Sequence, residues 1–435
     1  MKIAVIGTGF VGVVTAAVYA SFGHQVFGLD IDQKKIDKLK KSQVPFYEPN
    51  LQELLEETQT KQQLHFTSEY KEAITDANLV VIAVGTPSRP DGSVNLDYLY
   101  AACASAAEYL SPGVVVAIKS TVPPGIFAQV EAKIKSVFSQ DFELASLPEF
   151  LKEGSAVHDT LHPDRVVIGA SSDAAFTLLE TLHAPLKAPV LKLKPESAQM
   201  AKYAANAYLA TRITFINQIA DLCQKAGADV EEVIKAIGLD QRIGSHYWYP
   251  GLGYGGSCFP KDVKELAHFA VSVGFDSNLF TMVDQLNSSR LDQLYLDFKN
   301  LVGGFAGKTV ALFGLAFKPQ TDDMREAPSL AFVPKLIADG AKLKAFDPQA
   351  NAQAKHIFAD ELTQKQLQLG DSLFETATNA DVIILLTEWP EFISFDYAQI
   401  RQKSKPQWII DTRNRLDAQK LRQLGFSYQG IGRTL

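Results

Sequence analysis

Residues 2–30, KIAVIGTGFVGVVTAAVYASFGHQVFGLD, decide the fold class of this chain. The apolar run KIAVI predicts a short buried strand, GVVTAAVYASF predicts a helix that Gly23 closes, and QVFGLD predicts a second strand. Two strands joined by one helix form a βαβ unit, in which the strands run parallel. The chain therefore begins as an α/β fold built on a parallel sheet.

Three glycines stand where the first strand meets the helix. Gly7, Gly9 and Gly12 form G-x-G-x-x-G, in which the first permits a tight turn, the second lets backbone approach a pyrophosphate and the third allows close packing. Asp30 ends the second strand at the distance where an acid accepts ribose hydroxyls and would repel a 2′-phosphate. We therefore expect dinucleotide binding, with NAD⁺ preferred to NADP⁺, although the nearby Lys35 weakens that preference slightly.

Strands and helices keep alternating beyond this unit. NLVVIAVGTP and GVVVAIKSTVPPG predict further strands, so residues 1–195 are expected to form a doubly wound parallel sheet with helices on both faces. Residues 196–300 predict helices, and the first of them, of about 30 residues, would span about 45 Å. KTVALFGLAF, KLKAFDP and DVIILLTEW predict a second α/β sheet over residues 301–435.

Composition excludes several classes of protein. The 435 residues carry a formal net charge of -7, so nucleic acid and anionic membrane surfaces are not expected partners. The chain shows neither a secretory leader nor an apolar run of about 18 residues, which predicts a cytoplasmic protein. The three cysteines suit neither a disulfide framework nor a zinc site, and His158 and His162 lack a third ligand, so no metal site is expected.

The three cysteines differ in their surroundings. Cys103 and Cys223 lie on apolar helical patterns, where a thiol behaves as a small buried hydrophobe. Cys258 follows two glycines and precedes FPKDVKELAHF, which predicts a helix with Pro260 in its first turn. A helix N-terminus stabilises a thiolate. On these residues alone, Cys258 is either a nucleophile or a thiol in a tight turn.

Polar residues at helical spacing suggest further site members. Lys202 and Asn206 share one face of the long predicted helix, and Asp262 lies in the first turn of the helix that follows the glycines. MAKYAANAY is otherwise small and apolar, so Lys202 either points into a cleft or stays solvated. Glu149 and Glu153, four residues apart in PEFLKEG, would suit one acid–base group and one positioning group.

The second α/β half lacks the glycine fingerprint, because GLAFK stands in its place. This half could hold a nucleotide but is not expected to hold the dinucleotide. Its Lys318, Arg325 and Arg413 either bind phosphates or face solvent, and their spacing leaves both interpretations open.

The chain resembles the UDP-glucose 6-dehydrogenase family in the motifs GTGFVG, VGTP, KSTVPPG, PEFLKEGSAVHD, AKYAANAYLA, DQRIG, GYGGSCFPKD and GLAFKPQTDD, which occur in this order from the N-terminus into the last domain. The resemblance implies two Rossmann-like domains joined by a long central helix, with NAD⁺ on the first and the nucleotide of UDP-glucose on the second. It also implies that the sugar 6-alcohol loses two hydrides to two NAD⁺ molecules in turn, giving UDP-glucuronate.

The resemblance also implies a covalent mechanism. Cys258 would attack the C6 aldehyde to form a thiohemiacetal, whose oxidation gives a thioester that water hydrolyses. Lys202 and Asn206 would stabilise the developing oxyanion. The other catalytic residues implied are Asp262 and Thr121, which would hold the water, Glu153 as the acid–base residue, and Glu149 as its support.

Ligand contacts follow from the same resemblance. The implied cofactor-binding residues are Gly7, Gly9, Phe10, Val11, Gly12, Asp30, Lys35, Thr86, Thr121, Glu153, Lys261 and Arg325. The implied substrate-binding residues are Phe150, Leu151, Lys152, Glu153, Lys202, Asn206, Arg242, Tyr249, Tyr254, Gly255, Lys318 and Arg413. Arg242 in DQRIG corresponds to an arginine that reaches the substrate of a neighbouring subunit, so a homodimer is implied. Met324 departs from the small polar residue of the family pattern, which weakens the assignment of Arg325 beside it.

Three other functions fit parts of this pattern. A dehydrogenase acting on GDP-mannose or a UDP-N-acetyl sugar would share the cysteine mechanism, but DQRIG and GYGGSCFPKD favour UDP-glucose. A two-electron hydroxyacid dehydrogenase would need neither the cysteine nor a second nucleotide-binding half. A non-catalytic regulator that binds NAD⁺ and a nucleotide sugar would have no need of Cys258, Lys202 and Asp262.

Overall fold

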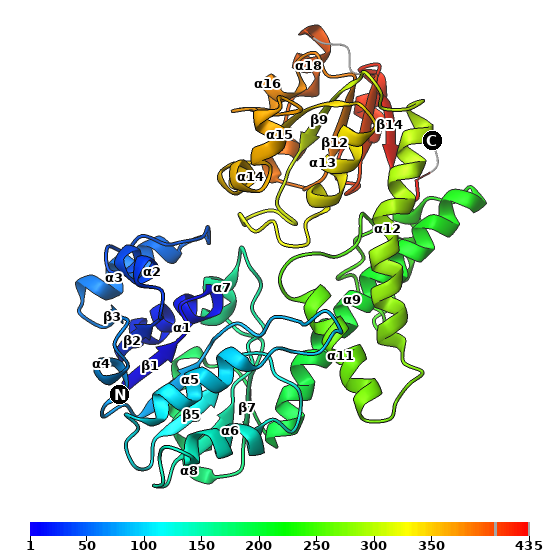
Figure 1. Ribbon diagram of the computed structural model, residues 1–435. Helices are drawn as coiled ribbons and strands as arrows, with labels where there is room; N and C mark the ends of the chain where they lie inside the picture. The colour runs from blue at the N-terminus through cyan, green and yellow to red at the C-terminus, as the bar shows by residue number, and fades with distance from the viewer. Residues whose placement is uncertain (404–406, 434–435) are drawn as a thin grey trace. The chain divides into compact units, whose positions relative to one another are not determined.

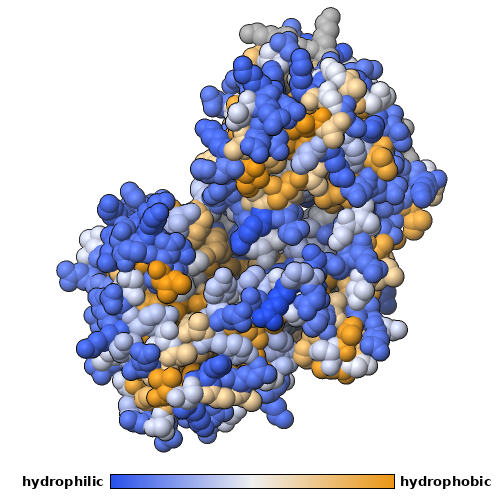
Figure 2. All heavy atoms as spheres, in the orientation of Figure 1, coloured by the Kyte–Doolittle hydropathy of each residue, from blue (hydrophilic) through white to orange (hydrophobic). Residues whose placement is uncertain are grey.

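The computed structural model describes residues 1–403 and 407–433, and the chain divides into two compact units. The first unit comprises Met1–Ala205 and Lys264–Asp276, and the second comprises Asn206–Val263 and Ser277–Leu435. Within the described residues, no helix is both long enough and apolar enough to span a membrane. Hydrophilic side chains cover most of the face in Figure 2, with scattered apolar ones between them. The three-part division at residues 195 and 300 stays a prediction.

The first unit is built on an eight-stranded sheet. The strand order is β3-β2-β1-β4-β5-β6-β7-β8. Neighbouring strands are parallel from β3 to β6, whereas β7 pairs antiparallel with β6 and parallel with β8. The strands are β1 (Lys2–Ile6), β2 (Gln25–Leu29), β3 (Leu64–Thr67), β4 (Leu79–Ile82), β5 (Val115–Ile118), β6 (Glu143–Ser146), β7 (Val166–Ala170) and β8 (Val190–Leu193). The predicted βαβ start and doubly wound sheet are confirmed.

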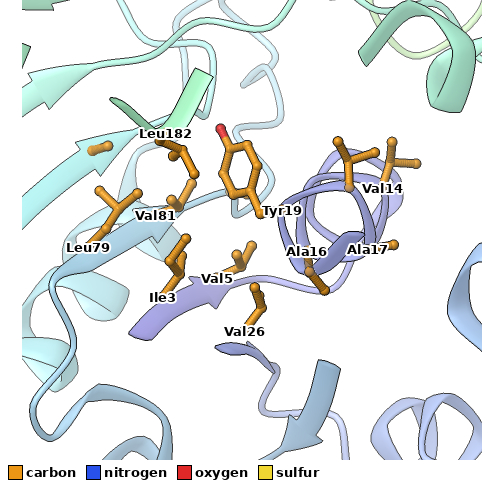
Figure 3. Close-up of a cluster of buried hydrophobic side chains, with 14 of the residues drawn as sticks. Ile3, Val5, Val14, Ala16, Ala17, Tyr19, Val26, Leu79, Val81 and Leu182 are labelled. Carbon is orange, nitrogen blue, oxygen red and sulfur yellow. The ribbon is translucent and has the colours of Figure 1, made fainter. Parts of the chain in front are cut away.

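Helices cover both faces of this sheet (Figure 1). They are α1 (Phe10–Ser21), α2 (Gln33–Leu39), α3 (Leu51–Thr60), α4 (Tyr70–Ile74), α5 (Asp97–Ala107), α6 (Phe127–Lys135), α7 (Ala156–Leu161) and α8 (Asp173–His183), and a short 3₁₀ turn spans Ala184–Leu186. One core layer packs α1, α2, α3, α7 and α8 on the sheet, and the other packs α4, α5 and α6. Figure 3 shows the first layer, where Val5 and Val81 of the sheet face Tyr19 and Ala16 of α1.

The second unit holds a six-stranded sheet of order β11-β10-β9-β12-β13-β14, in which every neighbouring pair is parallel. Its strands are β9 (Thr309–Phe313), β10 (Lys342–Phe346), β11 (Leu367–Leu369), β12 (Val382–Leu385), β13 (Trp408–Asp411) and β14 (Ser427–Gly430). Its flanking helices are α13 (Pro328–Ala338), α14 (Asn351–Ile357), α15 (Ala359–Thr363), α16 (Leu373–Ala377), α17 (Pro390–Ser394), α18 (Tyr397–Lys403) and α19 (Ala418–Gln423). The predicted second α/β half is confirmed.

Long helices occupy the middle of the chain, as the sequence predicts. They are α9 (Pro195–Ala226), α10 (Val230–Gly238), α11 (Phe259–Ser272) and α12 (Leu279–Leu301). The 32 residues of α9 end before Gly227, whose φ of +77° is a conformation that closes a helix at low cost for glycine. Both α9 and α11 run through a boundary between the two units, so each contributes residues to both.

Candidate active site

The glycine turn between β1 and α1 has the geometry that a dinucleotide needs. A Cβ on Gly7 would lie 2.6 Å from the Ala83 carbonyl oxygen, and a Cβ on Gly12 would lie 1.8 Å from the Gly7 carbonyl oxygen. No described atom lies within 4 Å of a Cβ built on Gly9. The outer glycines are therefore needed for packing, whereas the space at Gly9 is open for a ligand to approach the backbone.

The N-terminus of α1 faces the same open space. The helix begins at Phe10, followed by Val11, and no described side chain caps its first amides. Uncapped amides at a helix N-terminus bind anions such as the pyrophosphate of a dinucleotide. The turn and the helix start therefore fit NAD⁺ as the sequence predicts.

Asp30, at the end of β2, organises the neighbouring edge. Its Oδ2 accepts hydrogen bonds from the Thr8 amide at 2.9 Å and hydroxyl at 2.8 Å, and pairs with Lys35 Nζ at 2.9 Å. Burial raises the pKa of Asp30, but bonds from Asp32, Lys35 and Thr8 outweigh burial and lower it overall. Asp30 is thus a fixed carboxylate at the position expected for the ribose, and Lys35 neutralises part of its charge.

The loops after β4 and β5 are tied together beside this turn. Thr86 Oγ1 donates to the Thr121 carbonyl at 2.9 Å, and Ser120 Oγ donates to the Val84 carbonyl at 2.7 Å. Thr86 is 6% exposed. The two predicted threonine contacts, Thr86 and Thr121, therefore lie next to each other.

A buried ion pair links the loop after β6 to α9. Lys202 Nζ lies 2.8 Å from Glu149 Oε1, with side-chain exposures of 4% and 8%, and 5.6 Å from the centre of the Phe150 ring. Glu149 Oε2 also accepts the Leu151 amide at 2.8 Å. The alternative of a solvated Lys202 is therefore wrong: burial of a charged lysine requires a partner, and Glu149 supplies it.

The two glutamates of PEFLKEG do not share a helix face. Residues 147–152 form an irregular loop, and α7 begins only at Ala156. Glu153 is 9% exposed and engaged by a neighbour, while the Lys152 amide donates to Asp159. The course of a loop, and not helical periodicity, therefore sets the positions of Glu149 and Glu153.

Lys119 is a buried titratable residue near this pair that the sequence interpretation missed. It directly follows β5, two residues after Ala117, and is 8% exposed. Burial lowers the pKa of its ammonium to about 8, with Glu149 raising it and Lys202 lowering it. The motif KSTVPPG could have indicated this burial, since both faces of a parallel sheet are covered and a lysine directly after one of its apolar strands is rarely exposed.

The glycine loop before Cys258 packs without free space for side chains. A Cβ on Gly255 would lie 2.2 Å from the Glu326 carbonyl oxygen, and one on Gly256 would lie 2.6 Å from the Phe317 ring. The Gly256 amide also donates to the Arg325 carbonyl at 3.0 Å. The glycines are therefore required for the approach of this loop to residues 317–326.

Cys258 stands at the start of α11, as predicted. Its carbonyl accepts the Asp262 amide at 2.8 Å, which makes this the first turn of the helix. Its Sγ lies 3.5 Å from Ser257 Oγ, and the residue is partly exposed. By contrast, Cys103 and Cys223 are buried, and burial raises the pKa of the Cys103 thiol to about 12. Partial exposure and a helix N-terminus are the conditions that favour a reactive thiol, and of the three cysteines Cys258 meets both.

Asp262 is fixed by two partners in the second unit. Asn206 Nδ2 donates to its Oδ2 at 2.5 Å, and Lys261 Nζ lies 2.6 Å from its Oδ1. Asp262 is 1% exposed. The structure therefore brings together Cys258, Asn206, Lys261 and Asp262, of which Lys261 was expected at the cofactor rather than at this carboxylate.

Three polar anchors of this loop were not found from the sequence. Asn217 Oδ1 of α9 accepts the Gly251 amide at 2.8 Å, and Arg290 Nε of α12 donates to the Gly251 carbonyl at 2.5 Å. Asn287 accepts the Tyr254 amide and donates to its carbonyl. Each anchor lies more than thirty residues from its partner, so no local pattern indicated it.

The second sheet uses its equivalent carboxylate for folding. Asp347 follows β10 as Asp30 follows β2, and its Oδ2 accepts the Leu315 and Ala316 amides at 2.7 and 3.0 Å and the Trp389 indole at 3.2 Å. Asp347 is 1% exposed. Because its hydrogen-bonding capacity is used inside the fold, the Asp347 carboxylate is not open to a dinucleotide ribose.

The remaining predicted substrate contacts lie in different segments and differ in their partners and exposure. Arg413 donates to the carbonyls of Leu386 and Phe317 and lies 3.3 Å from Glu388, so it supports loops of the second sheet. The Tyr254 hydroxyl is buried, with no hydrogen-bond partner among the described residues. The other members are Lys318 beside Phe317, Arg325 paired with Asp323, Arg242 paired with Asp240 and 88% exposed, and Tyr249, which is 56% exposed.

Known protein families match all three parts of the chain. The NAD binding domain of the UDP-glucose/GDP-mannose dehydrogenase family matches residues 1–187, its central domain matches 196–289 and its UDP binding domain matches 311–418. A UDP-glucose 6-dehydrogenase of Pseudomonas aeruginosa is 41% identical over 442 residues, which cover 100% of this chain and 98% of that protein. One of Bacillus subtilis is 40% identical and covers 99% of this chain and 93% of its own length.

Solved structures of dehydrogenases superpose on nearly the whole chain. A UDP-glucose dehydrogenase from Pyrobaculum islandicum superposes with a TM-score of 0.92 at 34% identity, covering 99% of this chain and 98% of that one. A UDP-D-ManNAc dehydrogenase from Pyrococcus horikoshii gives 0.86 at 28% identity, covering 100% and 99%. The likeness therefore spans both sheets and the helices between them.

Proposed function

Since this chain belongs to the UDP-glucose/GDP-mannose dehydrogenase family, we propose that it oxidises UDP-glucose to UDP-glucuronate with reduction of two NAD⁺ per sugar. The primary alcohol, one water and two NAD⁺ give the carboxylate, two NADH and three protons. Relatives at 38–41% identity named UDP-glucose 6-dehydrogenases support this substrate over GDP-mannose or a UDP-N-acetyl sugar.

The observation that carries the proposal is the set of side chains at the start of α11. Cys258 opens the helix, and the buried Asp262 one turn later is held by both Asn206 and Lys261. A nucleophile next to a fixed carboxylate is what covalent oxidation through a thioester requires, because the same site must bind an aldehyde and then admit water. A two-electron dehydrogenase has no use for the thiol.

NAD⁺ fits the first unit. The residues that would hold it are the turn Gly7–Gly12 with Phe10 and Val11, Asp30 and Lys35 at the ribose, and Thr86, Thr121 and Glu153. When bound, the nicotinamide supplies the hydride acceptor for each of the two oxidations. The open space at Gly9 and the uncapped amides of α1 support this placement.

Each catalytic residue of the chain has a separate role in the reaction of the sugar. Cys258 Sγ adds to the aldehyde carbon to form a C–S bond, and the carbonyl oxygen takes the negative charge of the thiohemiacetal. Lys202 and Asn206 stabilise this oxyanion. After oxidation to the thioester, Asp262 and Thr121 hold the water that breaks the C–S bond, Glu153 exchanges the protons, and Glu149 keeps Lys202 in position.

We further propose a homodimer in the cytoplasm. Arg242 is 88% exposed and held by Asp240, so its guanidinium projects from the surface and is available to a neighbouring subunit's substrate. We also propose that Lys261 and Arg325 contact the cofactor. The remaining proposed substrate contacts are Phe150, Leu151, Lys152, Tyr249, Tyr254, Gly255, Lys318 and Arg413.

One experiment tests the mechanism. Cys258→Ala is expected to abolish formation of UDP-glucuronate while NADH binding, followed by fluorescence titration, stays within twofold of wild type. Cys103→Ala is the matched control, because its thiol is buried in the first unit and should leave activity unchanged. Acid production by Cys258→Ala at a near-normal rate would defeat the covalent mechanism.

The substrate and stoichiometry need a second measurement. Wild-type enzyme should release two NADH per UDP-glucose and show far lower kcat/KM with GDP-mannose and UDP-N-acetylglucosamine. One NADH per sugar would indicate a two-electron dehydrogenase instead. No activity with UDP-glucose would overturn the substrate assignment.

A further inference from the structure

A buried carboxylate outside the predicted catalytic set lies on α11 one turn beyond Asp262. Glu265 is 4% exposed, although glutamate is almost never buried to this degree without partners. It belongs to the first unit, which includes α11 from Lys264 onward. No step of the proposed mechanism uses it, so its burial needs another explanation.

The two oxygens of Glu265 hold two different segments of the first unit. Ser88 Oγ donates to Oε1 at 3.2 Å, and Tyr203 Oη donates to Oε2 at 2.8 Å. Ser88 follows Thr86 by two residues in the loop after β4, and Tyr203 follows Lys202 directly in α9. One carboxylate therefore joins the loop that carries a predicted cofactor contact to the helix that carries a predicted catalytic lysine.

A second contact lies one turn further along α11. The ring Nδ1 of His268 lies 3.2 Å from the Asp91 carbonyl oxygen, at the tip of the same loop. A Cβ built on Gly92 would lie 3.5 Å from the Lys264 carbonyl oxygen, so the loop tip rests on the helix backbone. The loop after β4 is thus attached to α11 at two points.

Close packing holds only the tip of this loop, so the attachment also depends on the hydrogen bonds. A pocket of about 210 Å³ remains between the loop and the helix, lined by Arg89 and Ser93 of the loop and by Glu265, His268, Phe269 and Ser272 of α11, among others. Where apolar packing is incomplete, the position of a loop depends on its polar anchors. A carboxylate suits this place because each of its oxygens can accept one hydroxyl donor.

We propose that Glu265 is a positioning residue for the oxidation: through Ser88 it orders the loop that presents Thr86, and through Tyr203 it sets the position of Lys202 on α9. The proposal rests on the proposed function for its kinetic consequences, but the ordering of the loop is independent of it. Each arm of the contact is a single hydroxyl, so the two effects are separable by substitution.

Two variants remove one arm each with little change of volume. Ser88→Ala is expected to weaken NADH binding about tenfold with kcat little changed, since one hydrogen bond to a charged group contributes about 1.5 kcal/mol. Tyr203→Phe is expected to lower kcat about tenfold with NADH binding unchanged, because Lys202 lies next to it. The matched control for Tyr203→Phe is Tyr208→Phe on an exposed part of α9, which should change neither quantity.

Hydrogen–deuterium exchange reports on the loop without activity. Ser88→Ala and Glu265→Gln should each speed amide exchange in residues 84–95 of the apoenzyme, and Tyr203→Phe should not. If Ser88→Ala and Tyr203→Phe lower only the melting temperature, while loop exchange, NADH affinity and kcat stay at wild-type values, Glu265 is purely structural and the proposal is wrong. Failure of wild-type enzyme to oxidise UDP-glucose would reject the proposed function alone, because the exchange and binding measurements would still decide the role of Glu265.

Discussion

The fingerprint glycines allow one prediction to be worked from distances, because Gly9 and Gly12 have opposite surroundings. A Cβ on Gly12 would lie 1.8 Å from the Gly7 carbonyl oxygen, whereas ordinary contact begins at 3.4 Å. Gly12→Ala therefore requires α1 to move from the end of β1 by about 1.6 Å, the difference between these two distances. Overpacking of a close-packed core costs about 1–3 kcal/mol. For a unit of 150–250 residues this lowers the melting temperature by roughly 2–12 °C.

Gly9→Ala has a different expected result. No described atom lies within 4 Å of the added Cβ, and the backbone at Gly9, with φ of -73° and ψ of -171°, is open to alanine. The loss of stability should be small, about 0.5 kcal/mol, because alanine is a poorer N-cap than glycine. The methyl group would instead occupy the space of the pyrophosphate and cost at least one charged hydrogen bond, which weakens binding of NADH about 10-fold or more.

Differential scanning calorimetry and NADH fluorescence titration on the two variants and wild type separate these effects. Gly12→Ala should melt earlier than Gly9→Ala, and Gly9→Ala should fold normally but bind NADH weakly. Wild-type NADH affinity in Gly9→Ala would refute the placement of the pyrophosphate at this turn. A wild-type melting temperature in Gly12→Ala would refute the packing argument.

Two further predictions concern stability. Burial lowers the pKa of His183 in the folded protein to about 4, so as the pH falls the unfolded chain takes up this proton before the folded one does. The free energy of unfolding is therefore nearly constant above about pH 6.5 and decreases between about pH 6.5 and pH 4. At pH 5 the loss is about 2 kcal/mol. Urea unfolding at pH 7 and 5 should show this loss in wild type and a smaller one in His183→Gln, and equal losses would exclude His183 as the cause. Arg290→Met should destabilise the second unit by about 2–3 kcal/mol and lower kcat, because the Gly251 carbonyl and Asp221 lose a buried partner. The exposed Arg422→Met is its control in thermal unfolding and steady-state assays, and equal behaviour of both variants would contradict the anchoring role.

Much of the fold was predictable because its signals are local. Strand and helix periodicity, the glycine turn at Gly7 and the acid at Asp30 lie within 30 residues and depend on backbone geometry that each segment adopts by itself. The long helix α9 was predictable for the same reason, since Pro195–Ala226 contains no glycine or internal proline. Cys258 at the start of α11 also followed from the glycines and proline around it.

The tertiary structure decided which polar groups meet. Lys202 could be buried or solvated until Glu149, 53 residues earlier, was found at 2.8 Å. The i,i+4 spacing of Glu149 and Glu153 indicated a shared helix face, but the segment is a loop whose course depends on its neighbours. Arg290 and Asn217 gave no signal, because an anchor is defined by a distant backbone group rather than by its own segment.

The sequence by itself determined that this is an NAD-dependent α/β protein with a glycine turn for the dinucleotide, two sheets, helices between them and one unusual thiol. Only the tertiary structure decided that Asp30 stays at an accessible edge while Asp347 is used inside the second sheet, and that Glu265 joins Ser88 and Tyr203 across 177 and 62 residues. The physical reason is the separation along the chain of the residues that determine each property. Backbone periodicity is fixed by neighbours along the chain, whereas the burial and pairing of a polar side chain depend on segments that only folding brings together.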